Sequence, residues 1–93
     1  MLTHHSFHSG KIQSIGVEID GRSVRAGFIA IGAYRFQIER SERMTVLRGE
    51  LQVRCGSELH FKHCLVGGSF FVSAHTEFEI VAEVPTVYLC ELF

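Results

Sequence analysis

GAYRFQI at residues 32–38 and ERMTVLRG at residues 42–49 are two strand-like segments separated by a short charged turn. In the first segment Tyr34 and Phe36 share one face of an extended strand, because side chains alternate with a period of two. In the second segment the carboxylate of Glu42 shares a face with apolar residues. The pattern predicts a central hairpin with one acidic group on an otherwise apolar face.

Further strand-like segments occupy the rest of the chain. An Asp-Gly pair at residues 20–21 separates two of them and predicts a tight hairpin turn. A Gly-Ser pair at residues 56–57 predicts a second hairpin, and no segment shows helical periodicity. About eight short strands at near-regular spacing favour an all-β barrel or jelly roll. We therefore expect residues 1–93 to form one domain, with residues 1–6 as a mobile N-terminal end.

Charge and hydrophobicity narrow the classes of partner. Nine Lys and Arg residues against ten Asp and Glu residues give a net charge of −1, which argues against a nucleic-acid-binding surface. No apolar run approaches the roughly 20 residues that cross a bilayer, and the N-terminal sequence does not resemble a signal peptide, so no membrane partner is expected. A 93-residue chain that is 46% hydrophobic has a thin core and much apolar surface, which predicts a homodimer.

The three cysteines indicate a reducing compartment. Cys55, Cys64 and Cys90 are odd in number and show no CxxC spacing, which is typical of reduced thiols. A cytoplasmic location is therefore expected.

Five motifs along nearly the whole chain carry a resemblance to one family. Residues 7–16 look like the opening F-x-G/S-G-K-V-x-S segment of this family, residues 32–36 like P-G-E-Y-x-F, and residues 42–49 like E-x-M-x-V with a glycine after two further residues. Residues 67–78 are similar to G-x-x-F-x-V-P-A-N-S-x-F, and residues 83–90 to E-P-T-x-Y-L-C. On these motifs the chain resembles the pyrimidine/purine nucleoside phosphorylases, a family of small cupins.

The resemblance implies both a fold and an activity. The implied fold is a single-domain cupin-type barrel, also called a double-stranded β-helix. The implied activity is that of a glycosyltransferase of the pentosyltransferase kind, which cleaves purine and pyrimidine ribonucleosides to free base and ribose 1-phosphate. Phosphate is the co-substrate, and no cofactor is implied.

Two residues are candidates for catalysis. Because the sugar becomes electron-poor during phosphorolysis, a carboxylate beside it would be stabilising. We expect Glu42 to face the barrel interior and to bind ribose hydroxyls or stabilise the developing cation, since a charge in an apolar cavity is costly without a task. His75 occupies the position of an asparagine in the family and titrates near neutral pH, so it is a candidate donor to the sugar or base.

A second group of residues is expected to bind the substrates. Aromatic and apolar side chains line most small-molecule sites, and arginine suits contact with an oxyanion. The expected wall for the base consists of Tyr34, Phe36, Met44, Phe78 and Tyr88. The candidate cations for phosphate are Arg25, Arg35, Arg43 and Lys11, which the sequence does not rank.

No metal site is predicted. The histidine pair that precedes the glutamate in the usual cupin motif is missing, because the matching positions are Phe36 and Ile38, or one residue earlier Arg35 and Gln37. Two histidine-containing groups have ligand types that zinc accepts but poor spacing. These groups are His60, His63 and Cys64, and His4, His5 and His8.

Departures from the family pattern keep other functions open. They fall at Ala33, Ser73, His75 and Glu91, and the last replaces an arginine of the family. If that arginine holds an anion, its replacement favours an alternative function, a non-catalytic small-molecule-binding cupin of the same fold. A metal-dependent cupin enzyme is a third alternative, which the missing histidine pair disfavours.

Overall fold

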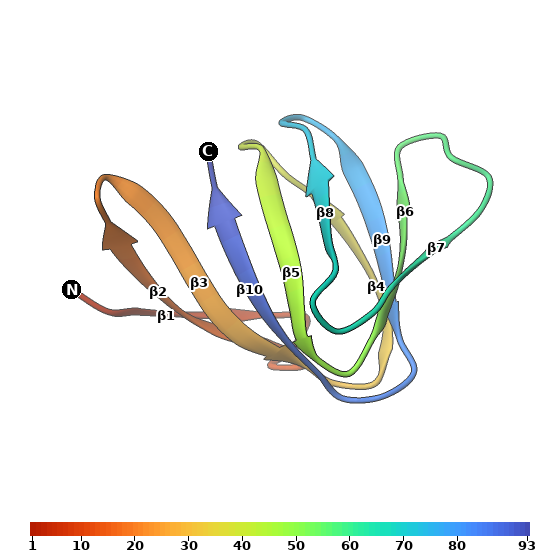
Figure 1. Ribbon diagram of the computed structural model, residues 1–93, viewed down its shortest axis with the longest axis horizontal. Helices are drawn as coiled ribbons and strands as arrows, with labels where there is room; N and C mark the ends of the chain where they lie inside the picture. The colour runs from red at the N-terminus through yellow and green to blue at the C-terminus, as the bar shows by residue number, and fades with distance from the viewer.

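Two antiparallel sheets make up the computed structural model, which describes residues 1–93 (Figure 1). One sheet has six strands in the order β1-β2-β3-β10-β5-β8, and the other has four in the order β4-β9-β6-β7. The strands are β1 (Thr3–Phe7), β2 (Ile12–Ile19), β3 (Arg22–Ile29), β4 (Gly32–Gln37), β5 (Glu42–Arg48), β6 (Leu51–Cys55), β7 (Lys62–Cys64), β8 (Ser69–Val72), β9 (Glu77–Ala82) and β10 (Thr86–Leu92). This jelly-roll-like arrangement confirms the all-β prediction. No helix is long and apolar enough to span a membrane.

The core lies between the two sheets and follows from strand alternation. On β9 the residues Phe78 and Ile80 are buried, and on β10 every second residue, including Tyr88 and Cys90, is buried. Both sheets contribute to one cluster of 15 buried apolar residues. Burial of each Val, Leu, Ile, Met or Phe side chain in this cluster stabilises the fold by roughly 1.5–3 kcal/mol relative to exposure.

The hairpin at the Asp-Gly pair is confirmed. Strands β2 and β3 pair in register from Ile19 with Arg22 onward. Asp20 and Gly21 have φ values of 52° and 76°, the left-handed conformation that tight two-residue hairpin turns require.

The predicted central hairpin is wrong. Strand β4 pairs with β9 in the four-stranded sheet, whereas β5 pairs with β10 and β8 in the six-stranded sheet. The segment between them crosses from one sheet to the other, because both strands turn an apolar face toward the same interior. Glu42 therefore lies opposite β4 across the core and is not paired with it.

Residues 3–7 form strand β1, which overlaps most of the N-terminal end expected to be mobile, residues 1–6. Strand β1 pairs with β2 along its whole length, from Thr3 opposite Gly16 to Phe7 opposite Ile12. Thr3, His5 and Phe7 thus share the inner face of the six-stranded sheet.

Strands β2 and β3 approach each other closely at Gly27. A side chain at this position would lie 2.7 Å from Ser14 Cβ, so only glycine fits between Ser14 on β2 and Tyr88 on β10. Ser14 is buried there, which directs its apolar neighbour Ile15 outward to 47% exposure.

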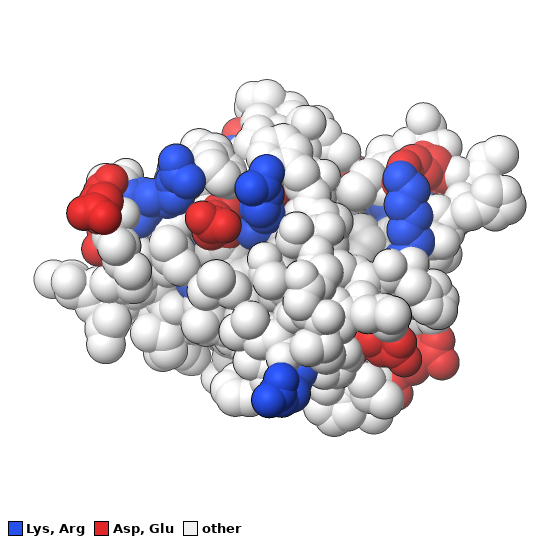
Figure 2. Space-filling model, viewed as in Figure 1, with Lys and Arg blue, Asp and Glu red and all other residues white.

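The outer face of the six-stranded sheet is unusually apolar. Besides Ile15 it exposes Phe28 at 67% and Leu47 at 40%. In Figure 2 the charged side chains are widely spaced and leave a broad uncharged area over the middle of β3, β10 and β5.

Candidate functional site

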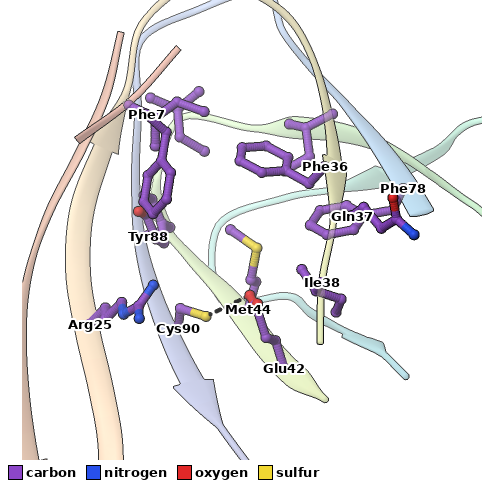
Figure 3. A pocket seen from close by; sticks show the side chains of 13 residues that line it. Phe7, Arg25, Phe36, Gln37, Ile38, Glu42, Met44, Phe78, Tyr88 and Cys90 are labelled. Atoms are coloured by element: carbon purple, nitrogen blue, oxygen red, sulfur yellow. Dashed lines mark hydrogen bonds between the residues drawn. The ribbon is translucent and has the colours of Figure 1, made fainter. Parts of the chain in front are cut away.

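A cavity of about 140 Å³ lies between the two sheets and opens to solvent (Figure 3). Most of its lining is apolar, and the charged groups that reach it are Arg25 from β3 and Glu42 from β5. The lining residues are Phe7, Ile12, Arg25, Ile29, Phe36, Gln37, Ile38, Glu42, Met44, Phe78, Ile80, Tyr88 and Cys90.

Glu42 lies at the start of β5 and is held by one neighbour on β10. The Cys90 thiol donates a hydrogen bond to Glu42 Oε1 with a distance of 3.1 Å (Figure 3). Burial and the nearby Glu42 charge raise the pKa of the Cys90 thiol strongly. The thiol therefore stays protonated at neutral pH and orients the carboxylate as a neutral donor.

Arg25 is a half-buried cation without an acidic partner. No carboxylate lies within ion-pair distance of its guanidinium, and its side chain makes no hydrogen bond. In Figure 3 it points toward Cys90 and the cavity. A half-buried guanidinium with free donors is suited to bind an oxyanion.

The other predicted cations lie outside the cavity lining. Arg35 pairs with Glu77 and Glu79 on the outer side of the four-stranded sheet. Arg43 lies over the Phe71 ring on the outer face of the six-stranded sheet, with 5.9 Å from its Cζ to the ring centroid. Lys11 is exposed in the turn before β2.

Three of the four predicted aromatic residues line the cavity. The Phe36 and Phe78 rings stack with 5.3 Å between their centroids, and Tyr88 lies across the cavity from them. Tyr34 is buried in the core instead, where its hydroxyl donates to the carbonyl oxygen of Ala30 with a distance of 2.6 Å. Met44, also predicted, contributes its thioether to the cavity wall.

His75 lies outside the cavity lining, in the loop after β8. Its side chain is exposed and its φ is 61°, a left-handed conformation that is uncommon for residues other than glycine. Its backbone N–H donates to the carbonyl oxygen of Ile38 with a distance of 2.9 Å. Because Ile38 lines the cavity, the loop braces the cavity rim through its backbone.

Two polar lining residues were missed by sequence reasoning. Cys90 shares the inward parity of Tyr88 on the same strand, so the Tyr-Leu-Cys motif itself contained the signal. Gln37 is exposed at the end of β4, and its parity alone predicts an outward side chain. It reaches the cavity lining from the last position of β4.

The departures from the family pattern lie outside the cavity. Glu91 is on the outer face of β10, 3.8 Å from Arg22, so the charge at this position does not enter the cavity. Ala33 and Ser73 are exposed, and neither lines it. No three His, Cys, Asp or Glu side chains come together in a metal-binding arrangement.

Sequence comparisons match the chain over almost its full length. A profile of the family described as pyrimidine/purine nucleoside phosphorylase matches residues 2–92. The pyrimidine/purine nucleoside phosphorylase of Sorangium cellulosum is 38% identical over 98% of this chain and 98% of the relative. That of Aeromonas salmonicida is 35% identical over 98% of this chain and 97% of the relative.

Structural comparisons agree. A protein of unknown function from Vibrio parahaemolyticus superposes with a TM-score of 0.94 at 33% identity, covering 98% of this chain and 97% of the other. An RmlC-like cupin from Shewanella frigidimarina superposes with a TM-score of 0.77 at 17% identity, covering 99% of this chain and 83% of the other.

The two sheets and the cavity between them define a cupin-type fold. Within that class, the full-length match at 38% identity is specific. The chain belongs to the pyrimidine/purine nucleoside phosphorylase family.

Proposed function

We propose that this protein is a nucleoside phosphorylase that cleaves purine and pyrimidine ribonucleosides to free base and ribose 1-phosphate. In this reaction an oxygen of phosphate forms a bond to the anomeric carbon while the bond from that carbon to the base nitrogen breaks. The electron pair leaves with the base, and the proton carried by the phosphate ends on the base. The enzyme would thus be a pentosyltransferase.

The cavity residues suit this chemistry. Glu42 is placed to stabilise positive charge on the ribosyl group, since a preorganised carboxylate in a mostly apolar cavity interacts more strongly with a developing cation than it would in bulk water. The stacked Phe36 and Phe78 rings and the Tyr88 ring offer aromatic surface to a base of either class without demanding one pattern of hydrogen bonds. Arg25 is the predicted cation that reaches the same cavity.

The observation that carries the proposal is that two opposite charges enter this cavity without forming an ion pair. One carboxylate and one unpartnered guanidinium enter a single apolar space, and neither neutralises the other in an ion pair. Half-burying two charges that do not neutralise each other costs free energy of folding, which a purely structural role would not offset. The arrangement therefore favours a functional role for each residue.

The decisive experiment mixes the protein with inosine or uridine and follows the free base by chromatography. We expect base release with phosphate and none without it. Release without phosphate would indicate hydrolysis and would contradict the proposal. Nucleoside binding without any release would favour the non-catalytic binding protein.

Replacing Glu42 tests the catalytic assignment. We expect Glu42→Gln to lower kcat by about 100-fold or more while the fold is kept, because the amide still accepts the Cys90 hydrogen bond but carries no charge. Glu39→Gln, which changes an exposed carboxylate in the loop before β5, is the matched control. Full phosphorolysis by Glu42→Gln would remove Glu42 from the mechanism.

Several expectations remain predictions. These are the homodimer, the cytoplasmic location, the absence of a cofactor, and a role for His75 toward the sugar or base. Activity that survives treatment with a chelator would support the absence of a metal cofactor.

A further inference from the structure

A second recess of about 360 Å³ lies beside the cavity, on the inner face of β1, β2 and β3. Arg25 is the one residue that lines both spaces. Thr3 and His5 from β1 and Gly16 from β2 form the wall next to Arg25. None of these three residues was singled out for the active site by sequence reasoning.

Three side chains converge over Gly16. A Cβ at this position would lie 3.0 Å from Thr3 Oγ1, 3.1 Å from His5 Nε2 and 3.4 Å from Arg25 Cγ. The strand register explains the convergence, because Gly16 pairs with Thr3 on one side and with Arg25 on the other. Gly16 has an ordinary strand conformation, so here glycine leaves space and does not serve a turn.

We propose that this recess binds the phosphate co-substrate, with the Arg25 guanidinium, the His5 imidazole and the Thr3 hydroxyl as its donors. The inference rests on the proposed phosphorylase function. It goes further by placing two of the phosphate donors on β1. This strand is the edge of the six-stranded sheet at the end remote from β5, which carries Glu42.

The donor set matches a tetrahedral oxyanion. A guanidinium presents several N–H donors in one plane, and a hydroxyl and an imidazole N–H on β1 add directional donors. Thr3 Oγ1 and His5 Nε2 form a hydrogen bond of 3.0 Å, which holds both groups on the same side of β1, and the Thr3 hydroxyl also donates to the carbonyl oxygen of Gly16 with a distance of 3.5 Å. A phosphate oxygen would take the place of these partners when it binds. Glu18 also lines the recess, but it is exposed and makes no ion pair with Arg25.

The surroundings of His5 favour a neutral imidazole. Burial first, and then the charge of the neighbouring Arg25, lower the pKa of His5. The ring is therefore neutral at pH 7 and can donate through one nitrogen. Arrival of an anion beside it would oppose the effect of Arg25.

The volumes of the cavity and the recess support separate sites for nucleoside and phosphate. The cavity of about 140 Å³ is smaller than the roughly 300 Å³ at the lower end of small-molecule pockets. The cavity is therefore too small to hold phosphate together with the nucleoside, and the recess of about 360 Å³ gives the phosphate a separate space, with Arg25 lining both. A nucleoside in the cavity and a phosphate in the recess would both be within reach of this one cation.

Kinetics at varied phosphate concentration test the inference. We expect His5→Gln and Gly16→Ala each to raise the KM for phosphate about tenfold while the KM for nucleoside changes less than twofold, since each change disturbs a hydrogen bond to a charged ligand. His4→Gln is the matched control, because His4 is the next residue of β1, points to the opposite face and bonds Gln13. If Gly16→Ala proves unstable, His5→Gln alone decides.

A readout independent of activity is the imidazole NMR signal of His5, assigned by its loss in His5→Gln. Inorganic phosphate should shift this signal and leave that of His4 in place. An unshifted His5 signal, or an unchanged phosphate KM in both variants, would overturn the inference while phosphorolysis by the wild type stands. No phosphorolysis by the wild type would instead refute the proposed function.

Discussion

Cys90 is a residue whose chemistry is set by its position. Its thiol is buried, its pKa is raised, and its hydrogen bond goes to the carboxylate that we assign to catalysis. Such a thiol is a poor nucleophile, because the thiolate is the reactive species. Its contribution is to orient Glu42 and to stabilise the charged form of that carboxylate.

Cys90 should therefore behave as a positioning residue. We expect Cys90→Ala to lower kcat about tenfold with little change in the KM for nucleoside, because loss of the thiol donor leaves the Glu42 carboxylate less well oriented. Cys90→Ser, which keeps a donor, should restore most of the rate. Cys64→Ala, at a buried thiol outside the cavity, controls for loss of packing. A Cys90→Ser variant as slow as Cys90→Ala would assign Cys90 a purely structural role.

Single residues could be predicted only where strand parity decides. The inward position of Glu42, Phe78 and Tyr88 follows from alternation within their own strands. The choice of Arg25 among four cations does not, because it depends on which strands pair. His5 was missed for the same reason, although a lone glycine within a strand, Gly16, marks a close approach and was a usable signal.

Strand β9 shows how one element joins its neighbours outside the core. Its Glu79 lies opposite Arg35 on β4 and Arg54 on β6, with nitrogen-to-oxygen distances of 3.2 Å and 2.8 Å. Hydrogen bonding from Arg54 is the main cause that lowers the pKa of Glu79, and the charges of both arginines add to it.

This triad predicts a pH dependence of stability. A carboxyl with a lowered folded-state pKa stabilises the fold above its unfolded pKa of about 4.5, and this contribution is lost as the pH falls through the folded value. We expect Glu79→Gln to melt a few degrees below the wild type at pH 7, with the difference shrinking at pH 3. Thermal unfolding followed by circular dichroism measures this, with Glu39→Gln as control. An equal difference at both pH values would refute a charge-based effect.

At the level of elements the sequence predicted local features well. The Asp-Gly hairpin depends on two adjacent residues and was correct. The placement of β4 and β5 in different sheets depends on pairing with strands that are distant in the sequence. The short charged segment between them looks like a hairpin turn, so the sequence suggested that they pair with each other. Strand β1 was missed because its run of polar and histidine residues lacks the apolar alternation that predicts strands.

The whole molecule has one large apolar surface, on the outside of the six-stranded sheet. Ile15, Phe28 and Leu47 are exposed there, and the paired Arg22 and Glu91 lie toward one end of this face. Apolar patches of this extent on small domains mark interaction sites. A second copy of the chain is the occupant that we expect, since a two-fold interface pairs one such patch with itself.

This expectation is tested by light scattering after size exclusion. The wild type should have the mass of a dimer, and Ile15→Lys combined with Phe28→Lys should have that of a monomer, because a charge cannot be buried without a partner. Leu59→Lys is the control, since Leu59 is 83% exposed in the loop between β6 and β7 of the other sheet. A monomeric wild type would refute the homodimer.

The close approach at Gly27 has a bearing on mutational screens. Any side chain there would push β2 away from β3. Because β1 pairs with β2, β1 would move as well, and the cavity wall beside Tyr88 would be displaced. A screen that scores colonies by turnover would thus rank Gly27 with the catalytic groups, although it meets no substrate atom. Essentiality at this site would report the spacing of two backbones.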